Sequence, residues 1–420
     1  MRSRSSLIVS LACGVALLLA PAADASNLRG SQVRDKIAGG WLGAVIGGAW
    51  GRPTEFRFKG RVVPADRVPP WSVARANRYT FRGESDETYV EIPFLDGTLR
   101  AGPGAGWPDW GQALAASDFQ LFFANGRARD NLRAGVPAPL SGNPVNNPYA
   151  DDIDFQIESD WIGLAAPGQP GAAVDLAWRV GHVTNYGDGV YGGVMIAAMH
   201  AAAFQAAGIG GIVEAGREAV PEGSKYRAMI EDVLRWHAAH PRDWKATWRR
   251  LERRWNAHST AAKHTAVDSE FNVDAKLNGA YVLLGLLYGH GDLAQTIRVS
   301  MRAGQDSDCN PSNAASILGT WLGRDRIPPR FRHGISQHRR LPGTDYTLKR
   351  AIAANVEVAR QLTRSRGGQP RGDGWVLAPS PVQPAPFEQW GPKPAPEMGL
   401  PATRLARGRA TGRRGAEAPR

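Results

Sequence analysis

Two short acidic clusters, far apart in the chain, hold the residues best suited to chemistry. Residues 85–88 have the sequence SDET, and residues 306–309 have the sequence DSDC. Their oxygen donors favour magnesium, calcium or manganese over zinc. Because adjacent side chains on a helix or strand diverge, donors this close in sequence converge only where an element begins or a loop turns. We therefore interpret the two clusters as halves of one metal site.

The residues around both clusters predict such beginnings. A Gly-Glu break at residues 83–84 precedes the first cluster. The second cluster leads into Pro311, which suits a first helical turn, and then into an apolar run over residues 314–322. Asp and Ser are also the usual N-cap residues of helices, so capping is an alternative role for both clusters, and the two roles can coexist.

A third acidic region, the acidic segment, covers residues 151–160 with the sequence DDIDFQIESD. Its apolar residues alternate with acids, a pattern that indicates a half-buried pocket wall. The loop over residues 184–189 (TNYGDG) then begins an apolar helix, and its glycines and N-terminal amides could receive an anionic or hydroxyl-rich ligand. Alternatively, Asp188 only caps that helix.

The elements that must position these residues are mostly helical. Residues 35–50 are predicted to form one helix, on which glycine recurs every four residues at Gly39, Gly43, Gly47 and Gly51. This spacing gives a helix face without side chains, which a second helix can approach closely despite the low helix propensity of glycine.

Further along the chain, residues 190–207 and 278–288 are apolar nearly all round, which indicates buried central helices. Residues 213–240 and 241–256 are amphipathic and are predicted to be peripheral. Few stretches alternate as half-buried strands do. We therefore expect an all-α bundle.

Histidine and tryptophan residues within the apolar segments are predicted to belong to the core. His200 is flanked by apolar residues, and we interpret it as a hydrogen-bonded core histidine, with a ligand or base as the alternative. Tryptophan faces can stack on sugars, but most of those in this chain lie within apolar helices and are predicted to be core. Four examples are Trp41, Trp50, Trp161 and Trp321.

The first 25 residues have the pattern of a secretory signal peptide. Arg2 and Arg4 precede an apolar run over residues 7–20, and small residues follow at 23–25. Cys13 lacks the preceding pattern of a lipidated cysteine, so a soluble exported protein is expected. Cys309 is then the one remaining cysteine, so no intramolecular disulfide is expected. No later segment reaches the roughly 20 apolar residues of a membrane span.

Composition divides the remaining chain into residues 26–365, predicted to be one catalytic domain, and residues 366–420. The latter are rich in Pro, Gly and Arg and are predicted to be a disordered tail. The ends carry part of the net charge of +12. The excess left on the domain is modest and compatible with an anionic small substrate, and we expect no nucleic-acid partner.

These features, in this order, resemble the ADP-ribosylglycohydrolase family. The resemblance rests on residues 35–43 with 51–56, residues 85–88, residues 185–203 and residues 304–323. It implies an all-α fold, a binuclear magnesium or manganese centre, and hydrolysis of a glycosidic bond at ribose C1. On this resemblance, the metal-ligand positions fall on Ser85, Asp86, Glu87, Asp306, Asp308 and Cys309. Glu55 falls on the family's acidic gate residue beside the metals.

The chain departs from the family pattern at several of these positions. Glu87 replaces the usual aspartate, and Cys309 replaces the usual threonine with a thiol that matches magnesium poorly. The acidic segment takes the place of the family's Asn-Gly-Ser-type substrate loop, and Asn185 with Tyr186 takes the place of its Thr-His pair. The residues expected to bind substrate are Asp152, Asp154, Glu158, Asn185, Tyr186, Asp188 and Gly189.

The sequence thus predicts a monomeric, exported, metal-dependent hydrolase that acts on a small-molecule or protein-linked ribosyl glycoside. Two divalent cations, magnesium or manganese, would activate water, and Glu55 or Glu87 would act as the acid or base that transfers its proton. One alternative is a secreted ligand-binding protein that retains the scaffold without turnover. Another is a metal-dependent phosphohydrolase, which is less favoured because no P-loop glycine motif is present.

Overall fold

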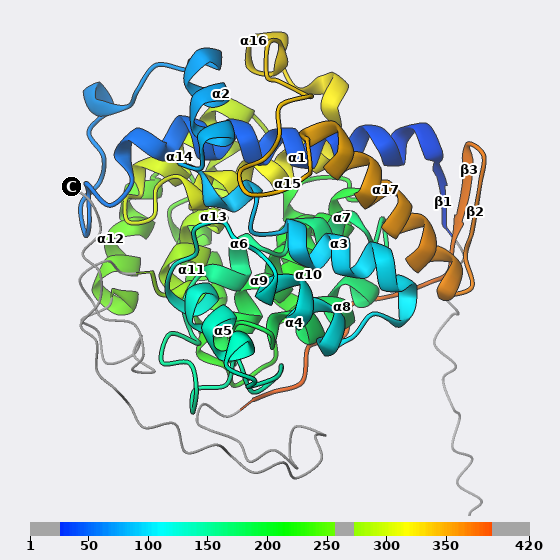
Figure 1. The fold of residues 1–420 in the computed structure, drawn as a ribbon. Helices are drawn as coiled ribbons and strands as arrows, with labels where there is room; N and C mark the ends of the chain where they lie inside the picture. The colour runs from blue at the N-terminus through cyan, green and yellow to red at the C-terminus, as the bar shows by residue number, and fades with distance from the viewer. Residues whose placement is uncertain (1–25, 257–272, 389–420) are drawn as a thin grey trace, which may run out of the picture.

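The computed structural model describes residues 26–256 and 273–388 (Figure 1). The predicted signal peptide and residues 389–420 lie outside the described residues and remain sequence predictions. The helices are α1 (Gly30–Gly51), α2 (Val73–Arg82), α3 (Ile92–Ala101), α4 (Trp107–Ala115), α5 (Phe123–Arg133), α6 (Asp154–Ile157), α7 (Asp160–Leu164), α8 (Pro170–Gly181), α9 (Asp188–Ala203), α10 (Ile209–Ala219), α11 (Lys225–Ala239), α12 (Trp244–Trp255), α13 (Ala275–Gly289), α14 (Leu293–Arg302), α15 (Cys309–Leu322), α16 (Pro329–Arg332) and α17 (Leu348–Ser365). The 3₁₀ turns are η1 (Arg52–Thr54), η2 (Ala65–Arg67), η3 (Asp86–Thr88), η4 (Gly102–Gly104) and η5 (Arg324–Arg326), and the strands are β1 (Ser26–Arg29), β2 (Gln369–Arg371) and β3 (Gly374–Leu377).

The predicted all-α fold is confirmed. Helices α9 and α13 are buried along nearly their whole lengths, as their apolar composition predicts. The amphipathic region over residues 213–240 is divided between α10 and α11, because Pro221 and Gly223 interrupt it. Trp41, Trp50 and Trp161 are buried core residues, as predicted.

The glycine face of α1 packs directly against α15 and the loop before it. A Cβ atom on Gly39, Gly43, Gly47 or Gly51 would overlap a backbone oxygen of residues 307–319. Two serines of α15 also donate hydrogen bonds to α1 carbonyls, from Ser312 Oγ to Ala44 O at 3.1 Å and from Ser316 Oγ to Gly40 O at 3.0 Å. The close helix approach predicted from the glycine spacing is therefore present, and it fixes the start of α15.

A small sheet, with strand order β1-β3-β2, is the one sheet in the described residues, and it joins the two ends of the domain (Figure 1). Residues 366–388 were predicted to be part of a disordered tail, and the structure corrects that boundary. Strand β3 pairs with β1 at the start of the described chain, β2 pairs with β3, and Trp375 and Leu377 are buried. Composition misses this order because the pairing partner lies at the opposite end of the sequence.

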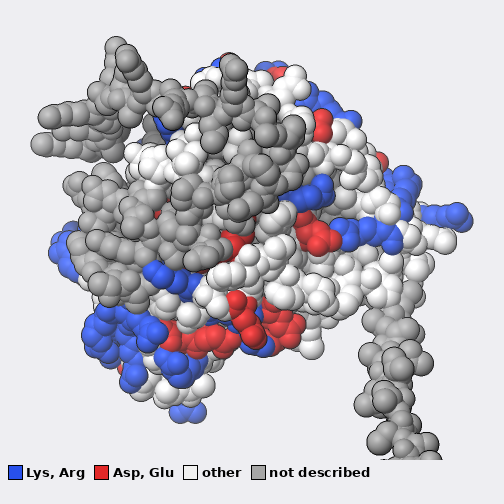
Figure 2. Space-filling view, turned by 90° about the horizontal axis from the view of Figure 1, so that it is seen from below, with Lys and Arg blue, Asp and Glu red and all other residues white. Residues whose placement is uncertain are grey.

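The surface shows two further features. No helix among the described residues is long and apolar enough to cross a membrane. Figure 2 shows that, on the face seen from below, Lys and Arg side chains gather at one corner next to a group of Asp and Glu side chains. That face therefore presents neighbouring patches of both signs.

Candidate metal centre

The first acidic cluster lies in η3 and the residue before it. Ser85 Oγ donates a hydrogen bond to Glu87 Oε1 at 2.7 Å, and both residues are buried, whereas Asp86 is partly exposed. Gly48 of α1 lies directly beside the Glu87 carboxylate, where a Cβ atom would overlap Oε1. The glycine helix therefore leaves room for the longer carboxylate that this chain has at position 87.

The second acidic cluster forms the start of α15. Asp308 is the N-cap residue, and its Oδ1 accepts a hydrogen bond from Cys309 N at 3.1 Å. Its other oxygen, Oδ2, faces the Arg52 guanidinium at 3.7 Å. Asp308 thus caps α15 and also lies among the potential metal ligands, so the two roles considered for it coexist.

The fold brings the two clusters together around Cys309. Donor atoms of Asp86, Glu87 and Cys309 lie within 4.8 Å of one another, and so do those of Asp306, Asp308 and Cys309. The Cys309 thiol and Asp86 Oδ1 are 3.9 Å apart. Two overlapping groups of potential ligands therefore share one sulfur atom.

Burial and mutual repulsion raise the pKa values of this group. Burial, followed by the Asp308 carboxylate, raises the pKa of Asp86 to about 6. The same two causes, in the same order, raise the pKa values of Glu87 and Asp306 well above their ordinary range. Burial and the nearby carboxylates also raise the pKa of the Cys309 thiol. Carboxylates this crowded retain protons unless a cation neutralises them.

The residues fit a divalent cation by a second criterion. Glu87 Oε2 and Asp306 Oδ1 are buried, and neither has a hydrogen-bond partner among the described residues. A buried acceptor without a partner is costly, and coordination of a cation would satisfy both oxygens. The donor set, four carboxylates and one thiol, suits a hard cation at all positions except the sulfur.

Glu55, the predicted gate residue, lies at the end of η1 beside this centre. Its carboxylate forms an ion pair with Arg52, whose guanidinium also faces Asp308. The side chains of Arg52 and Glu55 are 30% and 23% exposed. The centre therefore has one partly open side, which carries both a base and a fixed positive charge.

The acidic segment lies near the centre but differs from its predicted form. Its residues are fully buried rather than half-buried, because the segment folds into a loop and the short helices α6 and α7. The Asp86 charge contributes, after burial and nearer carboxylates, to raising the pKa values of Asp154 and Glu158. These two acids therefore share the electrostatic environment of the metal centre.

Two backbone amides and one neighbouring side chain hold the segment in place. Asp152 Oδ2 accepts from Ala124 N at 2.9 Å, and Asp154 Oδ2 accepts from Asn125 N at 2.7 Å. Asn185 Nδ2 donates to Asp152 Oδ1 at 2.9 Å. The predicted substrate residues Asp152, Asp154 and Asn185 are thus in one hydrogen-bonded group.

The predicted substrate residues Tyr186, Asp188 and Gly189 belong to the loop over residues 184–189 and to the start of α9. Tyr186 and Gly189 are buried. Asp188 Oδ1 accepts a hydrogen bond from Tyr226 N at 3.1 Å, and its Oδ2 lies 3.5 Å from Lys276 Nζ. The predicted anion-receiving amide of this helix start, Gly187 N, donates to a carboxylate of the chain itself, that of Glu388.

Comparison with known proteins decides the family. Residues 29–369 match the ADP-ribosylglycohydrolase family, which is most of the chain. The chain belongs to the ADP-ribosylglycohydrolase family. The predicted family assignment is therefore confirmed, and the family implies glycohydrolase activity on ADP-ribosyl-type bonds. No curated protein matches this chain.

A solved structure supports the fold of this family member. It is an "ADP-ribosylglycohydrolase-related protein complex", 16% identical in sequence, with a TM-score of 0.51. The match covers 79% of this chain and 99% of that chain. At this level of identity the likeness establishes the fold alone.

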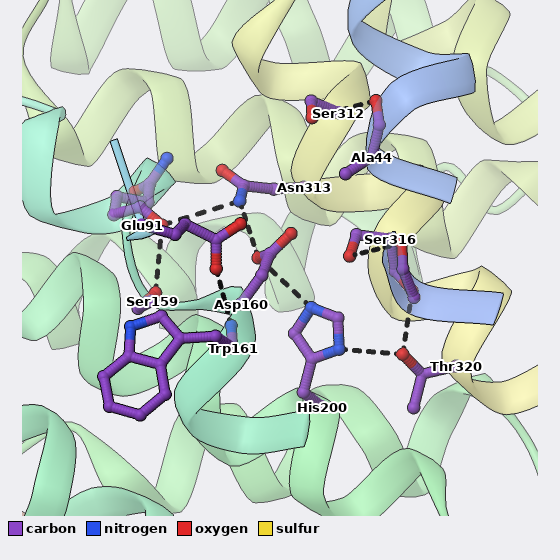
Figure 3. Close-up of polar contacts among 12 residues, drawn as sticks. Ala44, Glu91, Ser159, Asp160, Trp161, His200, Ser312, Asn313, Ser316 and Thr320 are labelled. Carbon is purple, nitrogen blue, oxygen red and sulfur yellow. Dashed lines mark hydrogen bonds and ion pairs between the residues drawn. The ribbon is translucent and has the colours of Figure 1, made fainter. Parts of the chain in front are cut away.

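A buried polar network in this chain was not predicted as a unit (Figure 3). Asp160 Oδ1 accepts from Asn313 Nδ2 at 2.9 Å and lies 3.1 Å from His200 Nε2. His200 Nδ1 is 2.9 Å from Thr320 Oγ1, and Glu91 Oε2 accepts from Trp161 N at 2.7 Å. The prediction that His200 is a hydrogen-bonded core residue is thus confirmed.

Sequence reasoning also missed Arg52 and Lys276, the two basic residues at these acidic groups. Arg52 precedes Glu55 by three residues, a spacing that allows an ion pair within one turn and was the available signal. Lys276 is fully buried, with its Nζ 2.8 Å from Asp274 Oδ2. Asp274 precedes it by only two residues, whereas its second partner, Asp188, comes from a distant segment and lies 3.5 Å from Nζ.

Proposed function

We propose that this chain hydrolyses a ribosyl glycosidic bond at ribose C1 and requires two divalent cations, magnesium or manganese. The observation that carries the proposal is the pair of ligand groups, Asp86 with Glu87 and Asp306 with Asp308, that meet at Cys309. Family membership supports the class of bond. The unpartnered oxygens of Glu87 and Asp306 support the requirement for cations.

The chain's own residues supply proton transfer and positioning. Bound divalent cations would act as Lewis acids and lower the pKa of water. Glu55 is partly exposed beside the centre, where Arg52 holds its carboxylate in an ion pair, and this carboxylate would accept a proton from the attacking water. Glu87, held by the Ser85 hydroxyl, is the alternative proton acceptor.

The substrate we propose is a small-molecule or protein-linked ribosyl glycoside met outside the cytoplasm. The export proposal is supported by the sequence pattern of residues 1–25. Carboxylates of the acidic segment lie near the centre and would repel a diphosphate unless a cation intervenes. A ribosyl nucleoside, which carries no diphosphate, is therefore proposed beside ADP-ribosylated proteins.

The test is a magnesium- and manganese-dependent hydrolysis assay with ADP-ribosyl-arginine, ADP-ribosyl-serine and simple ribosides, together with calorimetric titration of each metal. Asp306→Asn should abolish both metal binding and sugar release. Asp345→Asn is a matched control, because Asp345 is exposed and pairs only with surface Arg340 among the contacts described for it. This variant should retain both.

The outcomes separate the candidate functions. Metal-dependent sugar release that is lost in Asp306→Asn establishes a glycohydrolase and ranks its substrates. Metal binding without release from any substrate favours the secreted ligand-binding alternative. Sugar release that persists in Asp306→Asn contradicts the proposed centre.

A further inference from the structure

The segment over residues 378–388 extends beyond the part of the chain that matches the family, which ends at residue 369. We call it the strap. It has no helix or strand and contains four prolines, yet it lies against the helical body as it leaves β3 (Figure 1). Extended proline-rich backbone lacks internal hydrogen bonds, so its position depends on contacts with other elements.

Those contacts are regular and involve three helices. The strap forms hydrogen bonds from Gln169 Nε2 to Ala378 O (2.8 Å), Gly171 N to Ser380 O (3.0 Å), Ala385 N to Ala219 O (2.8 Å), Tyr191 Oη to Pro386 O (3.0 Å) and Glu388 N to Tyr191 Oη (2.6 Å). These partners belong to the start of α8, the end of α10 and the first turn of α9. The strap is therefore docked at both ends, over residues 378–380 and 385–388.

The strap ends in a buried charge at the start of α9. The Glu388 side chain is 5% exposed, and its Oε2 lies 3.0 Å from His182 Nε2. The same oxygen accepts a hydrogen bond from Gly187 N at 3.2 Å. A buried carboxylate is stable only with such partners, and its removal would leave a buried N–H and an imidazole without theirs.

Gly187 connects this contact to the candidate site. It has φ of 54°, a left-handed conformation that favours glycine, and it directly follows Asn185 and Tyr186. Asn185 donates to Asp152 Oδ1, and Thr184 Oγ1 lies 3.4 Å from Glu158 Oε2. One side of the loop thus contacts the acidic segment, and the other side contacts the strap.

We propose that Glu388 is a positioning residue: through Gly187 it fixes the loop over residues 184–189 against the acidic segment, which makes the strap part of the catalytic domain. The effect on kinetics rests on the proposed function. The effect on the loop does not.

The test compares amide hydrogen exchange in the full-length chain and in Glu388→Ala, with Gln383→Ala as a matched control in the exposed middle of the strap. In Glu388→Ala, exchange of the amides of residues 184–189 should accelerate about tenfold or more, while α13 stays protected. Gln383→Ala should match the unaltered chain. With a ribosyl substrate, KM should rise more than kcat falls.

Two results would overturn the proposal. One is unchanged exchange of the Gly187 amide in Glu388→Ala, and the other is equal acceleration throughout the core, which would indicate global stabilisation alone. If Glu388→Ala does not fold, Glu388→Asp replaces it, because the shorter side chain keeps the charge but withdraws the carboxylate from Gly187. Exchange needs no turnover, so an inactive protein leaves this test intact and separates it from the proposed function.

Discussion

At the level of single residues, the centre departs from hard-oxygen chemistry at one atom. The Cys309 thiol lies where both ligand groups meet, and burial and the surrounding carboxylates favour its protonated form. A neutral thiol is a weak donor to magnesium. The identity of this side chain should therefore influence which metal the protein prefers.

We expect Cys309→Thr to tighten magnesium binding on the order of tenfold, because a hydroxyl oxygen is a harder donor than sulfur. Isothermal titration with magnesium would measure the change. Cys309→Val has a similar volume without a donor atom and should bind no better than the natural chain. Equal tightening in both variants would show that the donor atom at this position is irrelevant.

The raised carboxyl pKa values predict an unusual pH dependence for the metal-free protein. Folded Asp86 keeps its proton to about pH 6, and Asp151 and Asp152 keep theirs to about pH 7, whereas an unfolded chain releases them near pH 4. Between about pH 4 and pH 7 the folded state thus binds more protons than the unfolded state. Each of these groups should therefore cost on the order of 3 kcal/mol of stability as pH rises from about 4 to 7.

Urea unfolding in the presence of a chelator, from pH 4.5 to 7, would measure this decline. Asp86→Asn should reduce it, because the amide carries no proton to release. Added manganese should oppose it, because a cation favours the ionised carboxylates. A decline that is the same in Asp86→Asn and in the natural chain would exclude Asp86 as a cause.

Individual residues also show how far the sequence could predict the site. The acidic clusters were recognisable because four hard or polar donors stood together in each. Arg52 was not recognised, although it shares an ion pair with Glu55 and faces Asp308, since its second partner comes from a distant segment. Glu388 was assigned to a disordered tail, and its burial depends on His182 and Gly187.

At the level of elements, the contact between α1 and α15 decides where the second acidic cluster lies. Glycine every four residues was a sufficient signal, because the same interval repeats on one helix face. The acidic segment was harder to predict. Its alternation indicated a half-buried pocket wall, but amides from α5 and the Asn185 side chain hold Asp152 and Asp154 in the interior.

We predict that Gly43→Ala lowers the free energy of unfolding by about 1–3 kcal/mol or more, because the added Cβ would overlap Ala315 O. Gly210→Ala in α10 is the matched control, since its Cβ would meet nothing within 4 Å. That change should stabilise by about 0.5–1 kcal/mol through helix propensity. Chemical unfolding of both variants would check the opposite signs, and two equal effects would contradict the packing argument.

At the level of the whole molecule, the two ends of the domain close on each other. Gly30 N at the start of α1 donates to Asp373 O at 2.8 Å, and β1 pairs with β3. The all-α class was predictable from apolar periodicity. This closure was not, because its short strands lie in a region whose composition resembles a disordered tail.

We predict that Trp375→Ala destabilises the whole domain by about 3–5 kcal/mol, because the indole is buried beside Gly30 where the sheet meets α1. Val376→Ala on the exposed face of the same strand should change stability by less than about 0.5 kcal/mol. Thermal unfolding of the two variants would measure the difference. If Trp375→Ala were as stable as Val376→Ala, residues 366–388 would not contribute to the stability of the domain.

The contact between α1 and α15 also fixes the axial register of the two helices. Four glycines, one per turn, let backbone meet backbone, so sliding either helix by one residue would place side chains where only glycine fits. A side-chain interface can relax by changing rotamers, whereas this interface has no such freedom along the glycine face. Only a shift by a whole helical turn would bring glycine back against the α15 backbone. The axial register of α15 is therefore fixed, and with it the position of Asp308 and Cys309 at its first turn.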